Sequence, residues 1–145
     1  MRISGVSRDV GRSIGGVWWS YTRQSRVDAP VAGEFCVCLA EKDNPRHRAA
    51  LAELAIARQP DIRAGGEAGE RAAREVRARA LARGVVTGWA GAIDSATGAE
   101  IPYSEDACVE ALLEPANFPL LHFVLDVSDL SVTYRQAEEA RAVGN

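Results

Sequence analysis

The sequence predicts a single α+β domain that is mainly helical, with two short β-hairpins forming a small antiparallel sheet. Three observations predict this class. Two segments rich in aromatic and β-branched residues each lead into turn-forming residues, as hairpins do. Several segments carry capping residues and apolar spacings typical of helices. A length of 145 residues with 47% hydrophobic residues suits one core. We expect this domain at residues 17–145, after a flexible N-terminal arm at residues 1–16 that holds few large apolar side chains.

The first hairpin is expected between residues 17–22 and 34–39. Both segments are rich in aromatic and β-branched residues, and a proline and a glycine mark the turn region between them. Trp18 and Trp19 are neighbours, so a strand would point their rings to opposite faces of the sheet. Either both faces are covered or one indole is exposed.

Three helices are expected next, at residues 45–58, 67–83 and 105–114. Asn44 and Ser104 are favourable N-cap residues, and Pro45 is tolerated in a first helical turn. A proline and two adjacent glycines separate the first two helices, and Gly84 is expected just after the second. Glutamate–arginine pairs at (i, i+4) spacing should support that second helix. These pairs are Glu67 with Arg71, Glu70 with Arg74 and Glu75 with Arg79.

The second hairpin is expected from residues 85–93 and 100–103, with a polar turn at residues 94–98. Trp89 stands in its first strand among glycine and alanine, which allow a neighbouring ring or backbone to approach closely. Core packing is therefore expected for Trp89.

The C-terminal segment carries the most regular apolar pattern of the chain. Its members recur at alternating spacings of three and four: Leu120, Phe123, Val127, Leu130, Tyr134 and Ala137. One long helix, or two coaxial pieces with Ser128 as an internal cap, would display them as a single stripe. That stripe either packs on the protein's own core or binds a partner. The partner-binding candidates are Phe123, Val127, Leu130 and Tyr134.

Charge divides the chain into two parts. Residues 1–91 carry 15 Lys and Arg against 10 Asp and Glu, a formal charge of +5, and residues 92–145 carry 2 against 10, giving −8. The two parts could attract each other within the fold or meet partners of opposite sign. The overall acidity argues against nucleic acid as a partner, and the acidic residues interspersed in the arginine-rich segment favour a solvated, ion-paired surface.

No catalytic, cofactor-binding or metal-binding pattern stands out in the sequence. Cys36, Cys38 and Cys108 lack zinc-site spacing and are expected to be buried small apolar residues, with a reducing cytoplasm as the simplest compartment. No nucleophile has an evident base, so we expect no enzyme. No apolar segment approaches the length of a membrane span, and the N-terminus lacks the apolar region of a signal peptide.

Three blocks of the sequence follow one another in a fixed order: residues 16–19 with 35–40, residues 44–51 beginning Asn-Pro, and residues 85–104 with the pattern Val-x-x-x-Trp-x-Gly-x-x-Asp-x-x-x-Gly-x-x-Ile-Pro-Tyr-Ser. Together these blocks resemble the tail assembly chaperones of long-tailed, siphovirus-like bacteriophages. His47 stands where the family often has an aromatic residue, and the Ala/Arg-rich second helix departs from the family's pattern.

The resemblance implies viral tail morphogenesis by protein–protein interaction. Such a chaperone binds the phage tape-measure protein and the tail tube protein in the host cytoplasm and is not expected in the mature virion. It implies no cofactor, no nucleic acid and no membrane, and leaves homo-oligomer formation open. The alternative is a structural virion protein, such as a tail completion or neck component. A small metal-free enzyme is a third hypothesis.

Overall fold

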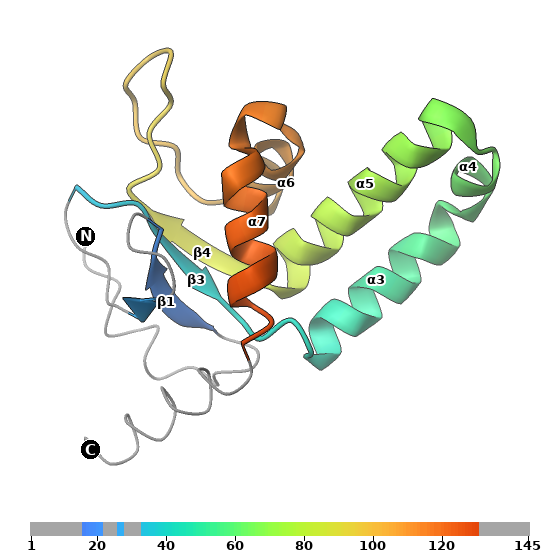
Figure 1. The fold of residues 1–145 in the computed structure, drawn as a ribbon, viewed down its shortest axis with the longest axis horizontal. Coiled ribbons are helices and arrows are strands. Elements are labelled where there is room, and N and C mark those ends of the chain that lie inside the picture. The colour runs from blue at the N-terminus through green and yellow to red at the C-terminus, as the bar shows by residue number, and fades with distance from the viewer. Residues whose placement is uncertain (1–15, 22–25, 28–32, 131–145) are drawn as a thin grey trace.

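The computed structural model describes residues 16–21, 26–27 and 33–130, which form a small sheet, helices against it, and a projecting helical hairpin (Figure 1). The elements are β1 (Val17–Ser20), β2 (Arg26–Val27), β3 (Cys36–Leu39), α3 (Pro45–Ala57), α4 (Gln59–Arg63), α5 (Gly66–Gly84), β4 (Val86–Ala90), α6 (Glu105–Leu113), the 3-10 helix η1 (Pro115–Asn117) and α7 (Phe118–Val127). The predicted α+β class, mainly helical with an antiparallel sheet, is confirmed. The predicted arm lies outside the described residues except for Gly16.

The sheet has the strand order β2-β1-β3-β4, and every neighbouring pair is antiparallel. β1 and β3 pair with Val17 opposite Leu39 and Ser20 opposite Cys36, which confirms the antiparallel pairing predicted for the two segments of the first hairpin. The two-residue β2 adds an edge strand that the sequence pattern does not indicate. β4 joins on the other side by pairing with β3, so strands from both predicted hairpins belong to one sheet.

The two neighbouring tryptophans on β1 lie on opposite faces of this sheet. Trp19 is fully buried on the face that packs against the helices. Trp18 is also buried and packs with Cys36 and Cys38 on the opposite face. Both faces of the sheet are therefore covered at these positions, and the alternative of one exposed indole is wrong.

The core lies between one face of the sheet and the helices α5, α6 and α7. Its buried members are Val17, Trp19, Val37, Leu39, Ala78, Leu81, Ala82, Val85, Val86, Trp89, Cys108, Leu112, Leu120, Phe123, Val124 and Val127. Only the C-terminal half of α5 contributes, because its N-terminal half lies in the helical hairpin beyond the sheet (Figure 1).

The second hairpin is shorter than predicted. After β4 the chain turns at Gly91, where φ is +81° and an added Cβ would lie 2.1 Å from the carbonyl oxygen of Glu34. Ile93 and Glu100 then form an isolated bridge, and no strand follows as far as Leu130, the last described residue. Pro102 has no N–H to give to a ladder. The predicted strand at residues 100–103 is thus reduced to one bridged residue.

Trp89 ties this loop to the core. Its indole Nε1 donates a hydrogen bond of 2.8 Å to the carbonyl of Ile101, and its ring meets Tyr103 edge-on at 5.2 Å. The Tyr103 hydroxyl donates to the carbonyl of Val86, 2.6 Å away, and burial raises the pKa of this phenol. The prediction that Trp89 is a core residue is confirmed.

The helical hairpin of α3, α4 and α5 begins at the predicted cap. The Asn44 side chain accepts a hydrogen bond from the backbone N–H of His47, and Pro45 occupies the first helical position. The same amide donates to the carbonyls of Glu41 and Gly84, which fixes the start of α3 against the end of α5. One buried side chain thus both caps a helix and joins two helices.

Three details of the helical hairpin differ from the sequence analysis. The segment around Pro60 is not a plain break, because the proline sits in the first turn of the short helix α4. Gly84 is the last residue of α5 and its φ is not positive, so it is no left-handed cap. It is instead a contact residue: a Cβ there would lie 2.5 Å from the Cα of His47.

The expected (i, i+4) ion pairs along α5 do not form among the described residues. Glu75 pairs with Arg58 of the preceding segment, at 3.0 Å. Arg79 reaches α6 and pairs with Glu105 and Asp106. Tertiary partners therefore replace the local ones that the spacing predicts.

Ser104 caps α6 by accepting from the N–H of Ala107, as predicted. The last described helix, α7, ends at Val127 with Ser128 as its C-cap, so the alternative of one unbroken helix is wrong and Ser128 marks a helix boundary, as the other alternative has it. Any second helical piece falls in residues 131–145, which lie outside the described residues. Ser128 lies buried at this end, and its carbonyl accepts from the N–H of Lys42. In the described part of the chain no single helix is long and apolar enough to span a bilayer; α6 with η1 and α7 reaches that length only as a pair bent by 89°.

Candidate functional site: an apolar groove beside unpaired arginines

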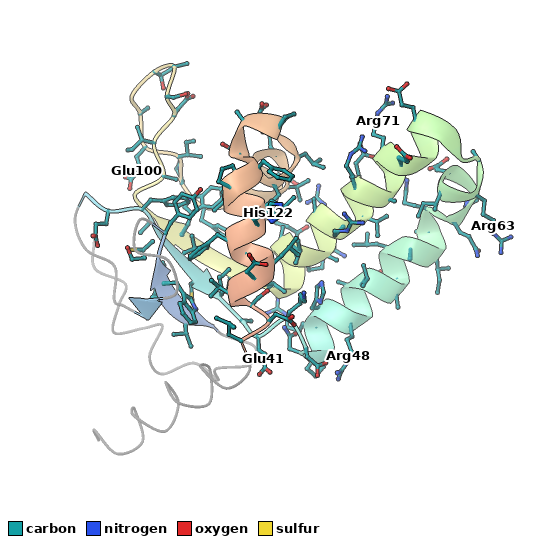
Figure 2. All side chains as sticks on the ribbon, viewed as in Figure 1. Glu41, Arg48, Arg63, Arg71, Glu100 and His122 are labelled. Carbon is teal, nitrogen blue, oxygen red and sulfur yellow. The ribbon has the colours of Figure 1, made fainter. Side chains whose placement is uncertain are left out.

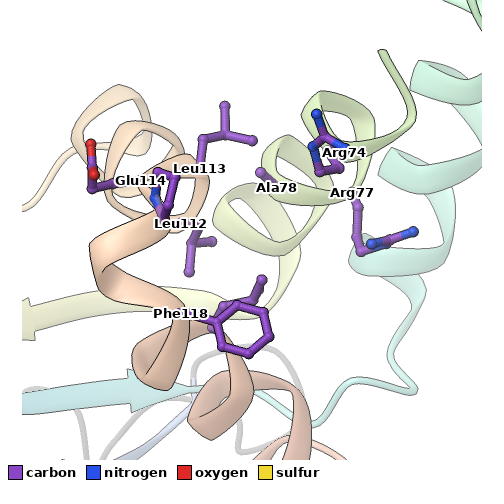
Figure 3. A pocket seen from close by; sticks show the side chains of 9 residues that line it. Arg74, Arg77, Ala78, Leu112, Leu113, Glu114 and Phe118 are labelled. Atoms are coloured by element: carbon purple, nitrogen blue, oxygen red, sulfur yellow. The ribbon is translucent and has the colours of Figure 1, made fainter. Parts of the chain in front are cut away.

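A hollow of about 330 Å³ opens between α5, the end of α6 and the start of α7 (Figure 3). Its lining residues are Arg74, Arg77, Ala78, Leu112, Leu113, Glu114, Pro115, Phe118 and Leu121. We call this hollow the α5–α7 groove. Its volume is at the lower end of the range of about 300–1,000 Å³ typical of ligand pockets.

Local sequence explains why the groove exists. Pro115 cannot continue α6, and the chain bends by 89° into η1 and α7. The bend places Leu113 and Phe118 on different sides of the hollow (Figure 3). Across from them α5 presents Ala78, whose small side chain leaves space between the helices.

Two large apolar side chains at the groove are exposed to solvent. Phe118 is 59% exposed and Leu113 is 36% exposed. The Phe118 ring meets the ring of His122 at 4.3 Å, and otherwise faces the open groove. Apolar residues gathered at a concave surface are typical of binding sites.

The arginines of α5 fall into two groups, those that pair with a carboxylate and those that have no carboxylate partner among the described residues. Arg79 and Arg83 hydrogen-bond to Glu105, and hydrogen bonding by Arg83 in particular lowers the pKa of that carboxyl. Arg74 and Arg77, which line the groove, are exposed and have no carboxylate within ion-pair distance in the described part of the chain. The groove therefore has a positively charged wall that the fold leaves unneutralised.

The residues predicted to bind a partner lie elsewhere on α7. Phe123 is 4% exposed and Val127 is 3% exposed, and both pack in the core, where the Phe123 ring meets Tyr21 edge-on at 5.2 Å. Leu130 follows the helix and is 38% exposed. Tyr134 lies outside the described residues. For Phe123 and Val127 the structure thus shows the alternative interpretation, in which the stripe packs on the protein's own core.

Sequence reasoning missed the groove residues on the other side of α7. α7 is apolar nearly all round, and the 3-4 stripe accounts only for the side that holds Phe123 and Val127. Phe118 and Leu121 fall outside that stripe. Large apolar residues on both sides of a short helix are the one pattern that indicates a second apolar surface.

The thiols of the chain are buried, and the carboxylate pair at the start of α6 is ion-paired. The cysteines are buried, and burial raises the pKa of Cys38 to about 11 and of Cys108 to about 12, so both of these thiols are neutral near pH 7. Within the described ranges, no group of three or more His, Cys, Asp or Glu could hold a metal ion. Glu105 and Asp106, a carboxylate pair in the first turn of α6, are bound by Arg79.

The fold and the groove define a small α+β domain with a projecting helical hairpin and an open apolar surface. The chain belongs to the YdaY prophage protein family, whose model matches residues 42–145, which include α3 to α7, β4 and the groove. It is therefore a protein of bacteriophage origin. No curated protein and no solved structure matches the chain.

Proposed function

We propose that this prophage protein is a tail assembly chaperone, which binds the tape-measure protein and tail tube subunits during tail morphogenesis in the host cytoplasm. The observation that carries the proposal is the α5–α7 groove, where exposed Leu113 and Phe118 adjoin unneutralised arginines. Such a surface suits reversible binding of a helical client, since amphipathic helices place apolar side chains into grooves of this kind.

The motifs that resemble tail assembly chaperones support the proposal because each has a defined place in the fold. The Asn-Pro motif forms the buried cap at Asn44 that fixes α3 to α5. The motif from Val85 to Ser104 contains Trp89 and Tyr103, which pack on each other, and ends at the cap of α6. Together these motifs position the helices that line the groove.

The proposed mechanism is shielding rather than chemistry. A tape-measure protein with long helical apolar stripes would aggregate before the tail tube covers it, and a groove that binds such stripes lowers the exposed apolar area. Binding of this kind needs no cofactor or metal. It ends when the tube subunits take over the same stripes, so the chaperone would be absent from the mature virion.

Co-expression tests the proposal. The full-length chain carrying an affinity tag is co-expressed with the tape-measure protein of the same prophage, and separately with its tail tube protein. We expect retention of the tape-measure protein, and a higher soluble yield of it than without the chain. Retention of neither protein would overturn the chaperone function.

Mass spectrometry of purified virions separates the chaperone from the structural alternative. A chaperone should be absent or far below one copy per tail. Stoichiometric presence in virions would instead assign the chain to the tail completion or neck components.

A further inference from the structure

We propose that the α5–α7 groove receives an amphipathic helix whose apolar face is bordered by acidic residues along the edge that meets α5. This inference refines the proposed function, because it specifies the chemistry of the client segment. It rests on the arrangement of charge and apolar surface around one hollow.

The positive wall of the groove continues along α5. Arg71, Arg74 and Arg77 are spaced by three residues, so each lies about one turn from the next. All three are exposed, and within the described ranges none has an acidic group at ion-pair distance. Arg74 and Arg77 therefore line the α5 edge of the groove, and Arg71 adds a further positive charge about one turn along the helix.

The apolar part of the groove suits the projecting side chains of a helix better than it suits a flat partner surface. Leu113 and Phe118 stand on different sides of the hollow, with Ala78 opposite them (Figure 3). Apolar residues at i, i+3, i+4 and i+7 of a bound helix would enter between them. Burial of Phe118, which is 59% exposed, would favour association.

Charge decides which apolar helix fits. A purely apolar segment over the groove would remove the hydrating water from the guanidinium groups of Arg74 and Arg77 and offer them no new hydrogen-bond acceptor. Burying an unpaired charge in this way is costly. Carboxylates can accept paired hydrogen bonds from each guanidinium group. Glu114 lies on the other side of the groove, so acidic residues are favoured only along the α5 edge.

Nucleic acid is the rival ligand for the same arginines. Phosphates would pair with Arg71, Arg74 and Arg77 but would give Leu113 and Phe118 no role in binding. The dependence of binding on both the arginines and Phe118 therefore separates a helix from a phosphate backbone.

The test uses three synthetic fluorescein-labelled peptides of about 18 residues, or five helical turns. All carry leucine at helical spacing, and the residues along one flank are glutamate, glutamine or lysine. Fluorescence anisotropy with the full-length protein should show the glutamate peptide binding about tenfold more tightly than the glutamine peptide, and the lysine peptide more weakly than either.

Matched variants locate the contact. Arg74→Glu should weaken the glutamate peptide by about tenfold and strengthen the lysine peptide, because the charge pattern is inverted. Arg63→Glu makes the same charge change at the far end of the helical hairpin (Figure 2) and should change neither affinity. Phe118→Ser should weaken all three peptides, whereas Ile56→Ser, at a residue 73% exposed on α3, should weaken none. Circular dichroism melting curves confirm that each variant is folded.

Several results would overturn the inference. These are no binding of any peptide, equal affinity for the three peptides, or equal effects of Arg74→Glu and Arg63→Glu. Displacement of the glutamate peptide by an oligonucleotide, whose own binding needs Arg74 but not Phe118, would assign the arginines to phosphate instead.

The inference and the proposed function can fail separately. If the tape-measure protein is retained equally by the wild type, Arg74→Glu and Phe118→Ser proteins, the chaperone function stands and the groove is not its site. If the glutamate peptide binds as expected but neither tail protein is retained, the groove binds acidic helices and the client is a different protein.

Discussion

Single side chains with two partners hold this fold together, and Asn44 is the clearest of them. Its oxygen accepts from the N–H of His47 at the start of α3, and its nitrogen donates to the carbonyl of Gly84 at the end of α5. Sequence alone indicates the first bond, because asparagine before proline is a helix cap. It does not indicate the second, which depends on a residue forty positions away.

Replacement of Asn44 by serine separates the two bonds. Serine can still cap α3, but it cannot reach the carbonyls of Glu41 and Gly84 with a donor. We expect Asn44→Ser to lower the free energy of unfolding by about 1–3 kcal/mol, because a buried acceptor loses its partner. Ser104→Asn, at the exposed cap of α6, should change it by less than about 0.5 kcal/mol. Urea denaturation of both variants measures the difference, and equal effects would show that the bond to Gly84 adds nothing.

Trp89 is the second such residue, since its ring fills the core and its Nε1 holds the loop at Ile101. Trp89→Ala should cost about 3–5 kcal/mol, the usual range for truncating a buried aromatic residue. Trp89→Phe keeps a ring and loses the hydrogen bond, so a smaller loss is expected. Thermal unfolding compares the two, and an unchanged midpoint for Trp89→Ala would place the indole outside the cooperative core.

At the scale of elements, the helical hairpin depends on close approach at both ends of α5. A Cβ at Gly69 would lie 2.8 Å from the carbonyl oxygen of Ile62, and one at Gly84 would lie 2.5 Å from the Cα of His47. These glycines let α5 lie against α4 and the start of α3 with little space between the backbones. The resulting contact explains why a helix with so few large apolar residues in its N-terminal half packs at all.

Gly84→Ala provides a test in which helix propensity and packing predict opposite changes in the free energy of unfolding. In an exposed helix, alanine is more favourable than glycine by about 1 kcal/mol. At Gly84 the added methyl group would collide with the backbone of α3, so we expect a loss of about 1–3 kcal/mol. Gly88→Ala in β4 is the control, because its Cβ would meet nothing closer than 3.8 Å. A stabilised Gly84→Ala protein would show that α3 and α5 lie further apart in solution.

Local sequence patterns predict where most helices and strands lie, but they predict poorly which of these elements contact one another. The caps at Asn44 and Ser104, the hairpin of β1 and β3 and the extent of α5 follow from residues close in sequence. The register of β4 on β3 and the short helix α4 depend on contacts that no local pattern encodes. The groove was missed for the same reason, because Arg74 and Phe118 belong to different elements that only the fold brings together.

At the scale of the whole molecule, charge is divided between two regions. Residues 45–84 carry nine arginines against five acidic residues, a formal charge of +4, and residues 92–130 carry eight acidic residues and no Lys or Arg, giving −8. Arg63 and Arg71 lie toward the far end of the helical hairpin, while Glu100 lies on the loop at the opposite side of the molecule (Figure 2). Of the two hypotheses drawn from the sequence, attraction within the fold is confirmed for Arg79 and Arg83, and binding of a partner of opposite charge stays a prediction for the arginines of the groove wall. Part of the charge is neutralised within the fold, and the arginines of the groove wall are not.

The ion pair of Arg79 with Glu105 joins the basic and the acidic region, and it predicts that the stability of the fold depends on both pH and salt. Hydrogen bonds from Arg83 and Arg79 lower the pKa of Glu105 below its usual 4.5. A lowered carboxyl pKa contributes stability above the unfolded value, and that contribution is lost as the pH falls through the folded value. The contribution of Glu105 should therefore be complete near pH 7 and fade below about pH 4.5. Its side chain is 38% exposed, so its interaction with Arg79 should be worth only about 1 kcal/mol or less.

A double-mutant cycle of Arg79→Gln and Glu105→Gln measures that interaction directly. We expect a favourable coupling at pH 7 and low salt, because Arg79 and Glu105 approach to 2.8 Å between α5 and α6. It should shrink in about 1 M salt, where the screening length falls to about 3 Å, and should shrink again as the pH falls through the lowered pKa of Glu105 and the carboxylate takes up a proton. Arg74→Gln is the control, since Arg74 has no carboxylate partner among the described residues and its cycle with Glu105→Gln should show no coupling. A coupling of Arg79 to Glu105 that is indifferent to both salt and pH would mean that the two side chains interact through packing. The division of charge would then contribute nothing to holding the helical hairpin against α6.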